Sequence, residues 1–443
     1  MSAPRPGRPP AGAGAHAELL ERHRRVMPAW LATYYAQPIE LVSGKGCTVV
    51  DREGREYLDF FGGILTTMTA YGLPEVVEAI REQAGRMLHT STLYLIQPMI
   101  ELAEEIAELS GIPDAKVFFT TSGSEANEAA LLFTTSWRRS SQVIALRNSY
   151  HGRSFATMGV TGNRGWSASS LSPLQVSWVH GAYRFRSPFR QLDDAAYIEA
   201  CVDDLRDVIA TTTSGDVACM IAEPIQGVGG FAVPPDGLFG AMKAVLDHHG
   251  IPFVSDEVQT GWGRTGEHFW GYQAHGIVPD ALTFAKGLGN GLPIAGVVAR
   301  REIVDCLTAS SISTFGGGPL VSAGALANLR YLLDHDLQGN ALRVGRHLIA
   351  RLRAAADDLA CVGEVRGKGL MIGLEMVGDD GHAPSPAAAT AVLEGCRERG
   401  LLVGKGGLYG NCLRVAPPMA ISLEEVDRGT DTLIEVLREV DRG

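Results

Sequence analysis

The sequence contains few cysteines, and their spacing matches no metal site. Seven cysteines are scattered over 443 residues, and no two of them form a CxxC pair. We therefore expect neither a disulfide framework nor a bound metal ion. Thiols used as ordinary core residues are typical of a reducing compartment, so we expect a cytoplasmic protein.

Long hydrophobic runs and excess positive charge are also missing. No apolar stretch is long enough to span a membrane, and the net charge is -11 with no clustered basic face, which argues against nucleic-acid binding. The first 18 residues are rich in Pro, Gly and Ala without an apolar segment. We expect residues 1–18 to be a disordered tail rather than a secretion signal.

The order of predicted strands and helices is typical of a large globular α/β protein. Between about residues 116 and 298, short apolar strands such as "KVFFTT", "VACMIAE" and "PFVSD" alternate with helical stretches, which predicts a mainly parallel sheet flanked by helices. We assign this large domain to residues 76–325. Residues 19–75, with a hairpin turning at Glu53–Gly54, and residues 326–443 are expected to form a smaller α+β domain from both chain ends.

Three polar features follow predicted strands, at the edge where parallel sheets bind ligands. In "TSGSEAN", Ser122 and Glu125 have capping-box spacing and Gly123 allows close backbone approach, which suits a phosphate. Asp256 ends "PFVSD", where a carboxylate needs water or a cationic partner, such as a protonated ring nitrogen. Lys286 ends "ALTFAK", where desolvation would make its amine nucleophilic.

Each feature has an ordinary alternative when it is taken alone. The segment that starts at Ser122 could be a simple helix N-cap. Asp256 could be a salt-bridged or capping residue, and Lys286 could be a snorkelling surface lysine. A dinucleotide loop in "GLGNG" is a further alternative, but the spacing lacks GxGxxG and leaves the lysine unexplained. Together, the phosphate cradle, the acid and the lysine describe a pyridoxal phosphate site.

Ten motifs in order then indicate a family. They include "TSGSEANE", "SYHGRS", "AEPIQGVGG", "SDEVQTGWGRTG", "TFAKGLGNGLPIAGVVA" and "STFGGGP". The chain resembles the class III, or ω-type, pyridoxal phosphate-dependent aminotransferases of fold type I, especially the alanine-glyoxylate aminotransferase 2 type. The resemblance covers nearly the whole chain after the tail.

The resemblance implies a role for each matching residue. Lys286 matches the catalytic Schiff-base lysine, and Asp256 matches the catalytic partner of the pyridinium nitrogen. The other expected cofactor-binding residues are Ser122, Gly123, Ser124, Tyr150, His151, Glu223, Val258, Gln259 and Thr314. Tyr150 and Val258 match residues on the two faces of the cofactor ring, although Tyr150 could merely fill core and Glu223 could be purely structural. Thr314 matches a threonine that reaches the phosphate of a neighbouring subunit, which implies a homodimer, and dimers could pair into tetramers.

Substrate recognition is assigned to three residues. Arg414 in "LRVAPP" matches the arginine for an α-carboxylate, Arg153 in "YHGRS" matches a position for a distal carboxylate, and Tyr94 lies in the family motif "HTSTLY". The 4-aminobutyrate enzymes carry a gating glutamate where this sequence has Val228, so the usual ion-pair switch for Arg414 is absent.

The expected activity is ping-pong transamination by an amino donor and a 2-oxo acid acceptor. The donor candidates are β-alanine, 3-aminoisobutyrate, 4-aminobutyrate and alanine, and the acceptor candidates are pyruvate, glyoxylate and 2-oxoglutarate. A mutase, racemase or decarboxylase of the same fold, and a non-catalytic protein that kept the fold, are the alternatives.

Overall fold

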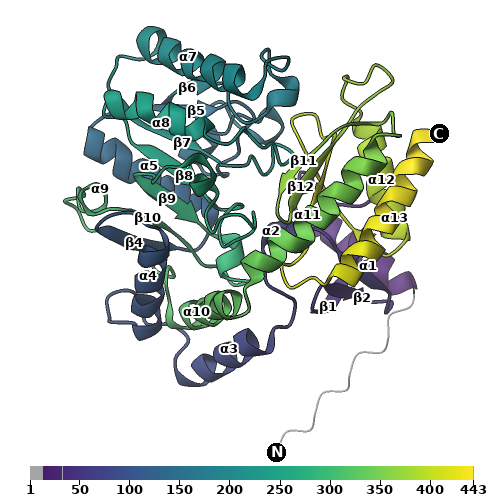
Figure 1. Ribbon diagram of the computed structural model, residues 1–443. Helices are drawn as coiled ribbons and strands as arrows, with labels where there is room; N and C mark the ends of the chain where they lie inside the picture. Colours follow the sequence, from purple (N-terminus) through teal and green to yellow (C-terminus); the bar gives the residue numbers. More distant parts are fainter. Residues whose placement is uncertain (1–12, 32, 443) are drawn as a thin grey trace, which may run out of the picture.

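A seven-stranded sheet with helices on both faces forms the centre of the larger part of the molecule (Figure 1). The computed structural model describes residues 13–31 and 33–442. In sheet order the strands are β4 (Ala115–Thr120), β10 (Ala295–Arg300), β9 (Ala281–Phe284), β8 (Phe253–Asp256), β7 (Val217–Ala222), β5 (Gln142–Leu146) and β6 (Gln175–Val179). Only β10 runs antiparallel to its neighbours, so the predicted mainly parallel sheet is confirmed.

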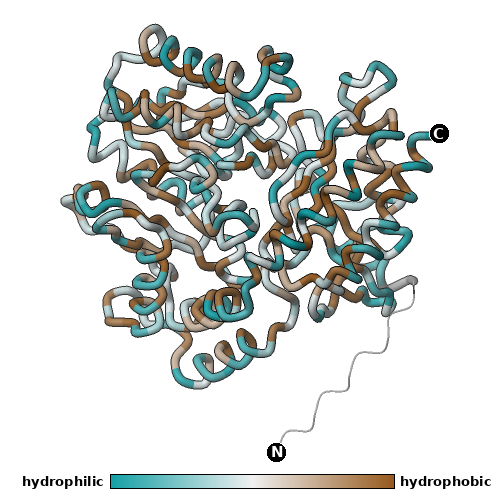
Figure 2. Tube along the Cα trace, in the orientation of Figure 1, coloured by the Kyte–Doolittle hydropathy of each residue, from teal (hydrophilic) through white to brown (hydrophobic). Residues whose placement is uncertain are grey.

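Alternate residues of the central strands enter two different cores. In β5, Val143 and Ala145 pack with helix α5 (Gly123–Arg138) on one face. Ile144 and Leu146 pack with α7 (Asp194–Thr212) and α8 (Leu238–His248) on the other. Because both faces are covered, a strand such as β7 is apolar along its whole length. In Figure 2 the strands of this sheet contain hydrophobic segments, which are coloured brown.

Further helices complete this part of the molecule. They are α2 (Gly62–Leu65), α3 (Pro74–Arg86), α4 (Gln97–Leu109), α6 (Phe155–Gly159), α9 (Arg301–Val304) and α10 (Pro319–Asp334). Helix α10 packs against α3 and α4. Short 3-10 turns include η1 (Arg164–Trp166), η2 (Arg184–Arg186), η3 (Gly271–His275) and η4 (Lys286–Leu288).

The two chain ends meet in the smaller part of the molecule. One sheet has the order β1 (Leu41–Lys45), β2 (Thr48–Asp51), β3 (Glu56–Asp59) and β13 (Leu401–Leu402), so an early strand pairs with a late one. A second sheet contains β11 (Val362–Lys368), β12 (Met371–Met376), β15 (Cys412–Val415) and β14 (Gly404–Gly406). Helices α11 (Leu337–Ala356), α12 (Pro386–Glu398) and α13 (Leu423–Arg442) pack with these strands, while α1 (Ala13–Val26) begins the described chain.

The hairpin expected at Glu53–Gly54 joins β2 and β3, with Gly54 at a φ of 85°. Glycine is favoured there because it adopts positive φ without a steric penalty.

Three predicted boundaries need correction. Residues 1–12 of the expected tail lie outside the described residues, but residues 13–18 belong to helix α1, whose sequence "AGAHAELLERHRRV" is rich in helix-forming residues. The predicted domain limits after residues 75 and 325 fall inside α3 and α10. A continuous hydrogen-bonded helix does not divide at such points, so the divisions belong in the adjoining loops.

Within residues 13–31 and 33–442, no helix is both long and apolar enough to cross a membrane. The same residues contain no group of three or more His, Cys, Asp or Glu side chains placed to hold a metal ion.

Candidate active site

A cavity of about 140 Å³ opens where several strands of the large sheet end. The segments that follow β4, β5, β7, β8 and β9 all contribute to its wall, because these strands point in one direction. The lining residues are Ser122, Gly123, Ser124, Asn127, Tyr150, His151, Gly152, Glu223, Asp256, Val258, Gln259 and Lys286. The structure thus brings together every predicted cofactor-binding residue except Thr314.

The first wall of the cavity is the start of helix α5. Ser122 is the N-cap, and its hydroxyl accepts a hydrogen bond from the Glu125 N–H at 3.3 Å. The predicted capping box is only half formed, because the Glu125 carboxylate reaches back to the N–H of Thr121 at 2.7 Å instead of that of Ser122. The N-terminal N–H groups of a helix favour an anion at this position.

Glycine keeps this wall open. A Cβ atom on Gly123 would lie 3.2 Å from both methyl groups of Val258, and one on Gly152 would lie 2.6 Å from the Ser124 hydroxyl oxygen. Gly152 also has a φ of 142°, which disfavours any other residue. Glycine at both positions therefore lets the segments that form this wall pack closely against Val258 and Ser124.

Asp256 is the last residue of β8 and is buried at the base of the cavity. Its Oδ2 atom accepts a hydrogen bond from the Asn127 side chain at 2.8 Å and lies 2.7 Å from His151 Nδ1. Its Oδ1 atom accepts from the Val258 N–H at 3.2 Å. These contacts fix the orientation of the carboxylate, and no arginine or lysine pairs with it among the described residues.

Lys286 follows β9 by two residues and opens the 3-10 turn η4. Its φ of 42° is unusual for a residue with a side chain, and such conformations persist where the surroundings hold them in place. Burial lowers the pKa of the Lys286 amine, although the nearby carboxylates of Asp256 and Glu223 oppose this. A larger neutral fraction makes the amine a better nucleophile and base.

Glu223 is buried directly after β7. Its two oxygens accept hydrogen bonds from the N–H groups of Tyr150 at 2.9 Å and Gly227 at 2.8 Å. Burial raises the pKa of Glu223 to about 7; His151 opposes the rise and Asp256 adds to it. This carboxyl can therefore hold a proton near neutral pH.

Arg414, on β15, is buried without any carboxylate partner in the described chain. Its Nε and Nη2 atoms donate to the Lys405 carbonyl at 3.2 and 2.9 Å, and its guanidinium lies 4.8 Å from the Phe61 ring centroid. Its Nη1 atom is buried and has no hydrogen-bond partner. Burial lowers the pKa of Arg414, and its charge in turn contributes to the lowered pKa of Lys286.

Arg414 is not among the residues that line the cavity of about 140 Å³, and neither are the other three predicted ligand-binding residues. Tyr94 is 68% exposed, and Thr314 lies on the exposed segment that precedes α10. The backbone N–H of Arg153 donates to the Ser124 hydroxyl at 3.2 Å, but its exposed guanidinium lies 6.0 Å from the Trp30 ring centroid. The side chains of Tyr94, Thr314 and Arg153 therefore do not contribute to the cavity wall within this chain.

Comparison with known proteins agrees with this geometry. The family described as aminotransferase class-III matches residues 32–437. The chain belongs to the class III aminotransferases. It is 38% identical to alanine–glyoxylate aminotransferase 2 homolog 2 of Arabidopsis thaliana, over 95% of this chain and 87% of that protein. It is also 36% identical to a leucine/methionine racemase of Thermococcus litoralis, over 96% of each chain.

A solved structure shows the same fold. An (S)-enantioselective ω-transaminase from Thermomicrobium roseum superposes with a TM-score of 0.89 at 32% identity, covering 96% of this chain and 98% of that one. The fold is therefore that of fold-type I pyridoxal phosphate enzymes, as expected from the sequence, and pyridoxal phosphate is the cofactor of this class III aminotransferase.

The cavity of the aminotransferase fits this cofactor. An anion site at a helix N-terminus, a carboxylate that pairs with no arginine or lysine among the described residues, and a lysine with a lowered pKa surround one space. Two buried polar atoms that line it, His151 Nε2 and Gln259 Oε1, have no hydrogen-bond partner. Buried polar atoms are rarely left unpaired, so these two are available to a bound group.

Sequence reasoning missed two residues of the cavity and the surroundings of Arg414. Asn127 lies three residues after Ser124 on α5, a helical spacing that could have identified it. Gly152 stands inside the quoted motif "SYHGRS". Tyr34, which contacts Lys405 and stacks on Phe61 at 5.7 Å, comes from the N-terminal segment and had no local signal.

Proposed function

We propose that this aminotransferase transfers the amino group of a small carboxylate-bearing donor to a small 2-oxo acid. The donor candidates are β-alanine, 3-aminoisobutyrate, 4-aminobutyrate and alanine, and the acceptor candidates are pyruvate, glyoxylate and 2-oxoglutarate. Pyridoxal phosphate, when bound, supplies an electron sink that stabilises negative charge on the donor's amine-bearing carbon. The remaining chemistry is assigned to residues of the chain.

Lys286 is the proposed general base, which takes the proton from the amine-bearing carbon and returns it one step later. The lowered pKa of Lys286 supports this role, because a base is effective when its pKa is near the operating pH. Asp256, held by Asn127 and His151, is proposed to keep the ring nitrogen of the cofactor protonated. The N-terminus of α5 is proposed to bind the phosphate.

The observation that supports this substrate class is the buried guanidinium of Arg414, which interacts with Tyr34 but forms no ion pair among the described residues. One guanidinium nitrogen has no partner, and the neighbouring position 228 is a valine whose carbonyl accepts from the Gly407 N–H at 2.9 Å. Among the described residues no carboxylate forms an ion pair with Arg414, although Glu223 is near enough to act on its pKa. A substrate carboxylate would satisfy the guanidinium as a bidentate partner, whereas an amine without a carboxylate would leave it unpaired.

A donor-by-acceptor activity panel tests this proposal on the purified holoenzyme. Amino acids with pyruvate, glyoxylate or 2-oxoglutarate should outperform simple alkyl amines and diamines. Arg414→Ala should lower kcat/KM for an amino acid on the order of 10- to 100-fold, the scale of one charge-assisted hydrogen-bonded contact, and should affect a carboxylate-free amine much less. Equal losses in kcat/KM for the amino acid and for the carboxylate-free amine would show that Arg414 does not recognise the carboxylate.

Arg153 is the matched alternative in the same panel. Its guanidinium is exposed and lies next to Trp30, whereas that of Arg414 is buried, so Arg153→Ala should have the smaller effect on small amino acids. A larger loss for Arg153→Ala than for Arg414→Ala would transfer carboxylate recognition to Arg153.

A racemase is the second candidate, because a relative of comparable identity is named a leucine/methionine racemase. A racemase needs no acceptor, so inversion of a single amino acid enantiomer in the absence of any 2-oxo acid would support it. Turnover that depends strictly on the 2-oxo acid would support transamination instead.

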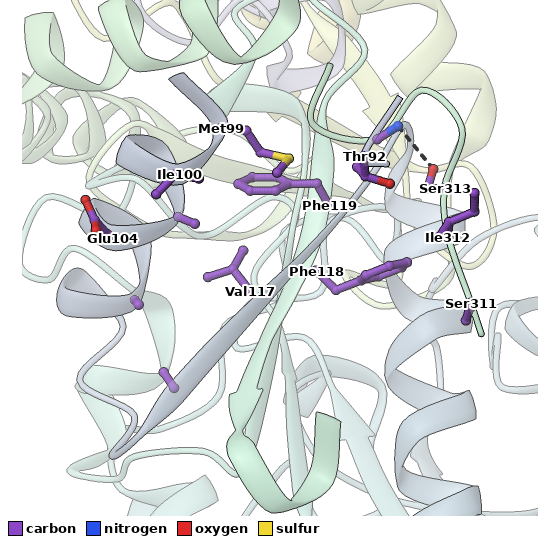
Figure 3. A pocket seen from close by; sticks show the side chains of 14 residues that line it. Thr92, Met99, Ile100, Glu104, Val117, Phe118, Phe119, Ser311, Ile312 and Ser313 are labelled. Carbon is purple, nitrogen blue, oxygen red and sulfur yellow. Dashed lines mark hydrogen bonds between the residues drawn. The ribbon is translucent and has the colours of Figure 1, made fainter. Parts of the chain in front are cut away.

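We also propose that the enzyme is a homodimer, with dimers that could form tetramers. The segment around Thr314 carries exposed apolar side chains, Ile312 at 57% and Phe315 at 65%. The adjoining pocket in Figure 3 is lined by Met99, Phe119 and Ile312. Exposed apolar surface of this kind is typical of a protein interface.

Thr314→Ala tests the shared site. If Thr314 binds the cofactor phosphate of the neighbouring subunit, the variant should retain pyridoxal phosphate more weakly by roughly 1–3 kcal/mol, the scale of a hydrogen bond to a charged group. Ser311→Ala, on the same exposed segment, is the control. A fully active monomer at assay concentration would contradict the shared site.

A cytoplasmic location remains our proposal. It is supported by seven cysteines that are all free in the structure, although the Arabidopsis relative is named as mitochondrial. Imaging of the tagged full chain in its native host would test it.

A further inference from the structure

A second and larger cavity lies beside the active site and shares no lining residue with it. It has a volume of about 530 Å³, which is within the range of small-molecule sites. One side is formed by the segments after β5 and β6, and the other by Leu408 and Tyr409 in the turn between β14 and β15. The cavity therefore lies between the large sheet and the strand that carries Arg414.

We propose that this cavity binds a small organic polyanion through Arg147, Arg164 and Arg186. All three arginines line it, and no aspartate or glutamate does. Arginine is the side chain best suited to phosphate and carboxylate groups, because its planar fork donates two parallel hydrogen bonds. The ligand class is a phosphate ester, a pyrophosphate or a di- or tricarboxylate.

Two of the three arginines that line the cavity have no carboxylate partner among the described residues. Arg147 and Arg164 are exposed and form no ion pair within the described part of the chain. Two carboxylates that contact lining residues are already engaged: Glu375 pairs with Arg186 at 2.7 Å, and Asp204 accepts from the His180 N–H at 2.7 Å. Burial lowers the pKa of His180, so this lining residue adds no positive charge at neutral pH.

The buried guanidinium of Arg186 is a second observation that points to a bound ligand. Its side chain is only 9% exposed, its Nε binds Glu375, and its Nη1 donates to the His382 carbonyl at 2.8 Å. The remaining nitrogen, Nη2, is buried and has no hydrogen-bond partner. A buried donor without a partner is rare in a folded protein, and an oxyanion in the cavity would satisfy it.

The other walls suit an organic body rather than a bare ion. Trp178, Tyr183 and Tyr409 line the cavity together with Leu408, and the hydroxyl of Ser167 is among the polar groups. Aromatic walls with a few polar groups are typical of sites that bind small molecules. The guanidinium of Arg186 lies 5.4 Å from the Tyr409 ring centroid, so the arginine and the aromatic wall are in contact.

Isothermal titration calorimetry on the pyridoxal phosphate-loaded enzyme tests this proposal. Loading occupies the phosphate site at α5, so that site cannot account for the binding. Pyrophosphate and citrate are titrated separately at matched ionic strength, with sodium chloride as the blank. We expect saturable binding of at least one probe, with one site per chain and weaker binding at higher salt. The two probes distinguish phosphate from carboxylate preference.

Substitutions of the lining arginines test whether the two probes bind in this cavity. Arg147→Gln and Arg164→Gln should each weaken binding about tenfold or more, the scale of losing a charged hydrogen-bond donor, and the double variant more. Arg428→Gln, at an exposed position on α13 that does not line the cavity, is the charge-matched control and should leave affinity unchanged. No saturable binding of either probe, or an equal loss in Arg428→Gln, would overturn the proposal. This readout does not depend on the donor or acceptor, so it can succeed or fail independently of the proposed activity.

Discussion

Two buried glutamates show how the active site differs from the rest of the interior. Glu223, in the cofactor cavity, and Glu375, on β12, are both almost fully buried. Burial raises the pKa of Glu223 to about 7. Burial also acts to raise the pKa of Glu375, but Arg366, Cys412, Asn411 and Arg186 outweigh it and lower the value to about 2.

The pKa values of Glu223 and Glu375 differ because the two carboxyl groups have different partners, and not because they differ in burial. Glu375 accepts hydrogen bonds from Arg186 at 2.7 Å, Arg366 at 2.9 Å and Tyr183 at 2.8 Å. Glu223 receives only two backbone N–H groups, and uncharged donors stabilise a carboxylate less than arginine does. In the Glu375 cluster two arginines neutralise the buried carboxylate, whereas the cofactor cavity contains buried polar atoms without a hydrogen-bond partner, His151 Nε2 and Gln259 Oε1. Four predictions test this distinction.

The largest effect is expected for Lys286→Ala. The cavity loses both its nucleophile and its base, so transamination should fall by roughly four orders of magnitude or more. Thermal unfolding of the apoenzyme should change little, because no hydrogen bond from the Lys286 side chain supports the fold among the described residues. Near wild-type activity in this variant would refute the assignment of Lys286.

Asp256→Ala should also reduce catalysis. Without the carboxylate beside His151 and Asn127, proton removal in a single turnover with excess cofactor should slow on the order of 100- to 1,000-fold, the scale of losing one preorganised electrostatic group. Asp256→Glu keeps the charge and should be less impaired. An unchanged single-turnover rate in Asp256→Ala would exclude the role.

Glu375→Ala should have the opposite character. Removing this carboxylate leaves Arg186 and Arg366 buried without their shared partner, so the free energy of unfolding should fall by roughly 3–5 kcal/mol. Urea unfolding followed by circular dichroism measures the loss, and Glu435→Ala, an exposed position on α13, should change it by less than about 0.5 kcal/mol. A loss as small as that of the control would show that the cluster is not a stabilising network.

The smallest effect is a pH dependence at Glu223. The pKa of this group is higher in the folded state than its ordinary value of 4.5, so the proton favours folding. The stabilisation is complete below pH 4.5 and is lost as the pH rises through about 7, amounting to roughly 3 kcal/mol for a shift of this size. In the apoenzyme, Glu223→Gln should therefore gain stability relative to the wild type between pH 5 and 8. A constant difference over that range would contradict the raised pKa.

Much of the cofactor cavity was predictable because its residues follow strands of a recognisable pattern. Asp256 and Lys286 come after apolar runs that became β8 and β9, and Ser122 caps the helix after β4. Parallel strands end at the same edge of a sheet, so strand prediction was sufficient to bring these residues together. The helical spacing from Ser124 could have placed Asn127 at the cavity, but its hydrogen bond to Asp256 joins residues 129 positions apart and depends on the packing of α5 on the sheet.

The Glu375 network could not be predicted in the same way. Its members come from η2, β11, β12 and β15, and each looks like an ordinary residue in its local sequence. The pairing of β3 with β13 likewise joins segments more than 340 positions apart. Such contacts depend on how the elements pack, which local propensity does not encode.

The sequence by itself determined the strand-helix order, the family and most of the residues that line the active-site cavity, since these depend on local periodicity and on short motifs. Only the tertiary structure decided which charges are neutralised. It placed Arg414 beside Phe61 without a carboxylate and gave Glu375 two arginines. It also assembled Arg147, Arg164 and Arg186 around one cavity. The reason is physical: the energy of a buried charge depends on its distance to other charges and to water, and the fold alone sets those distances.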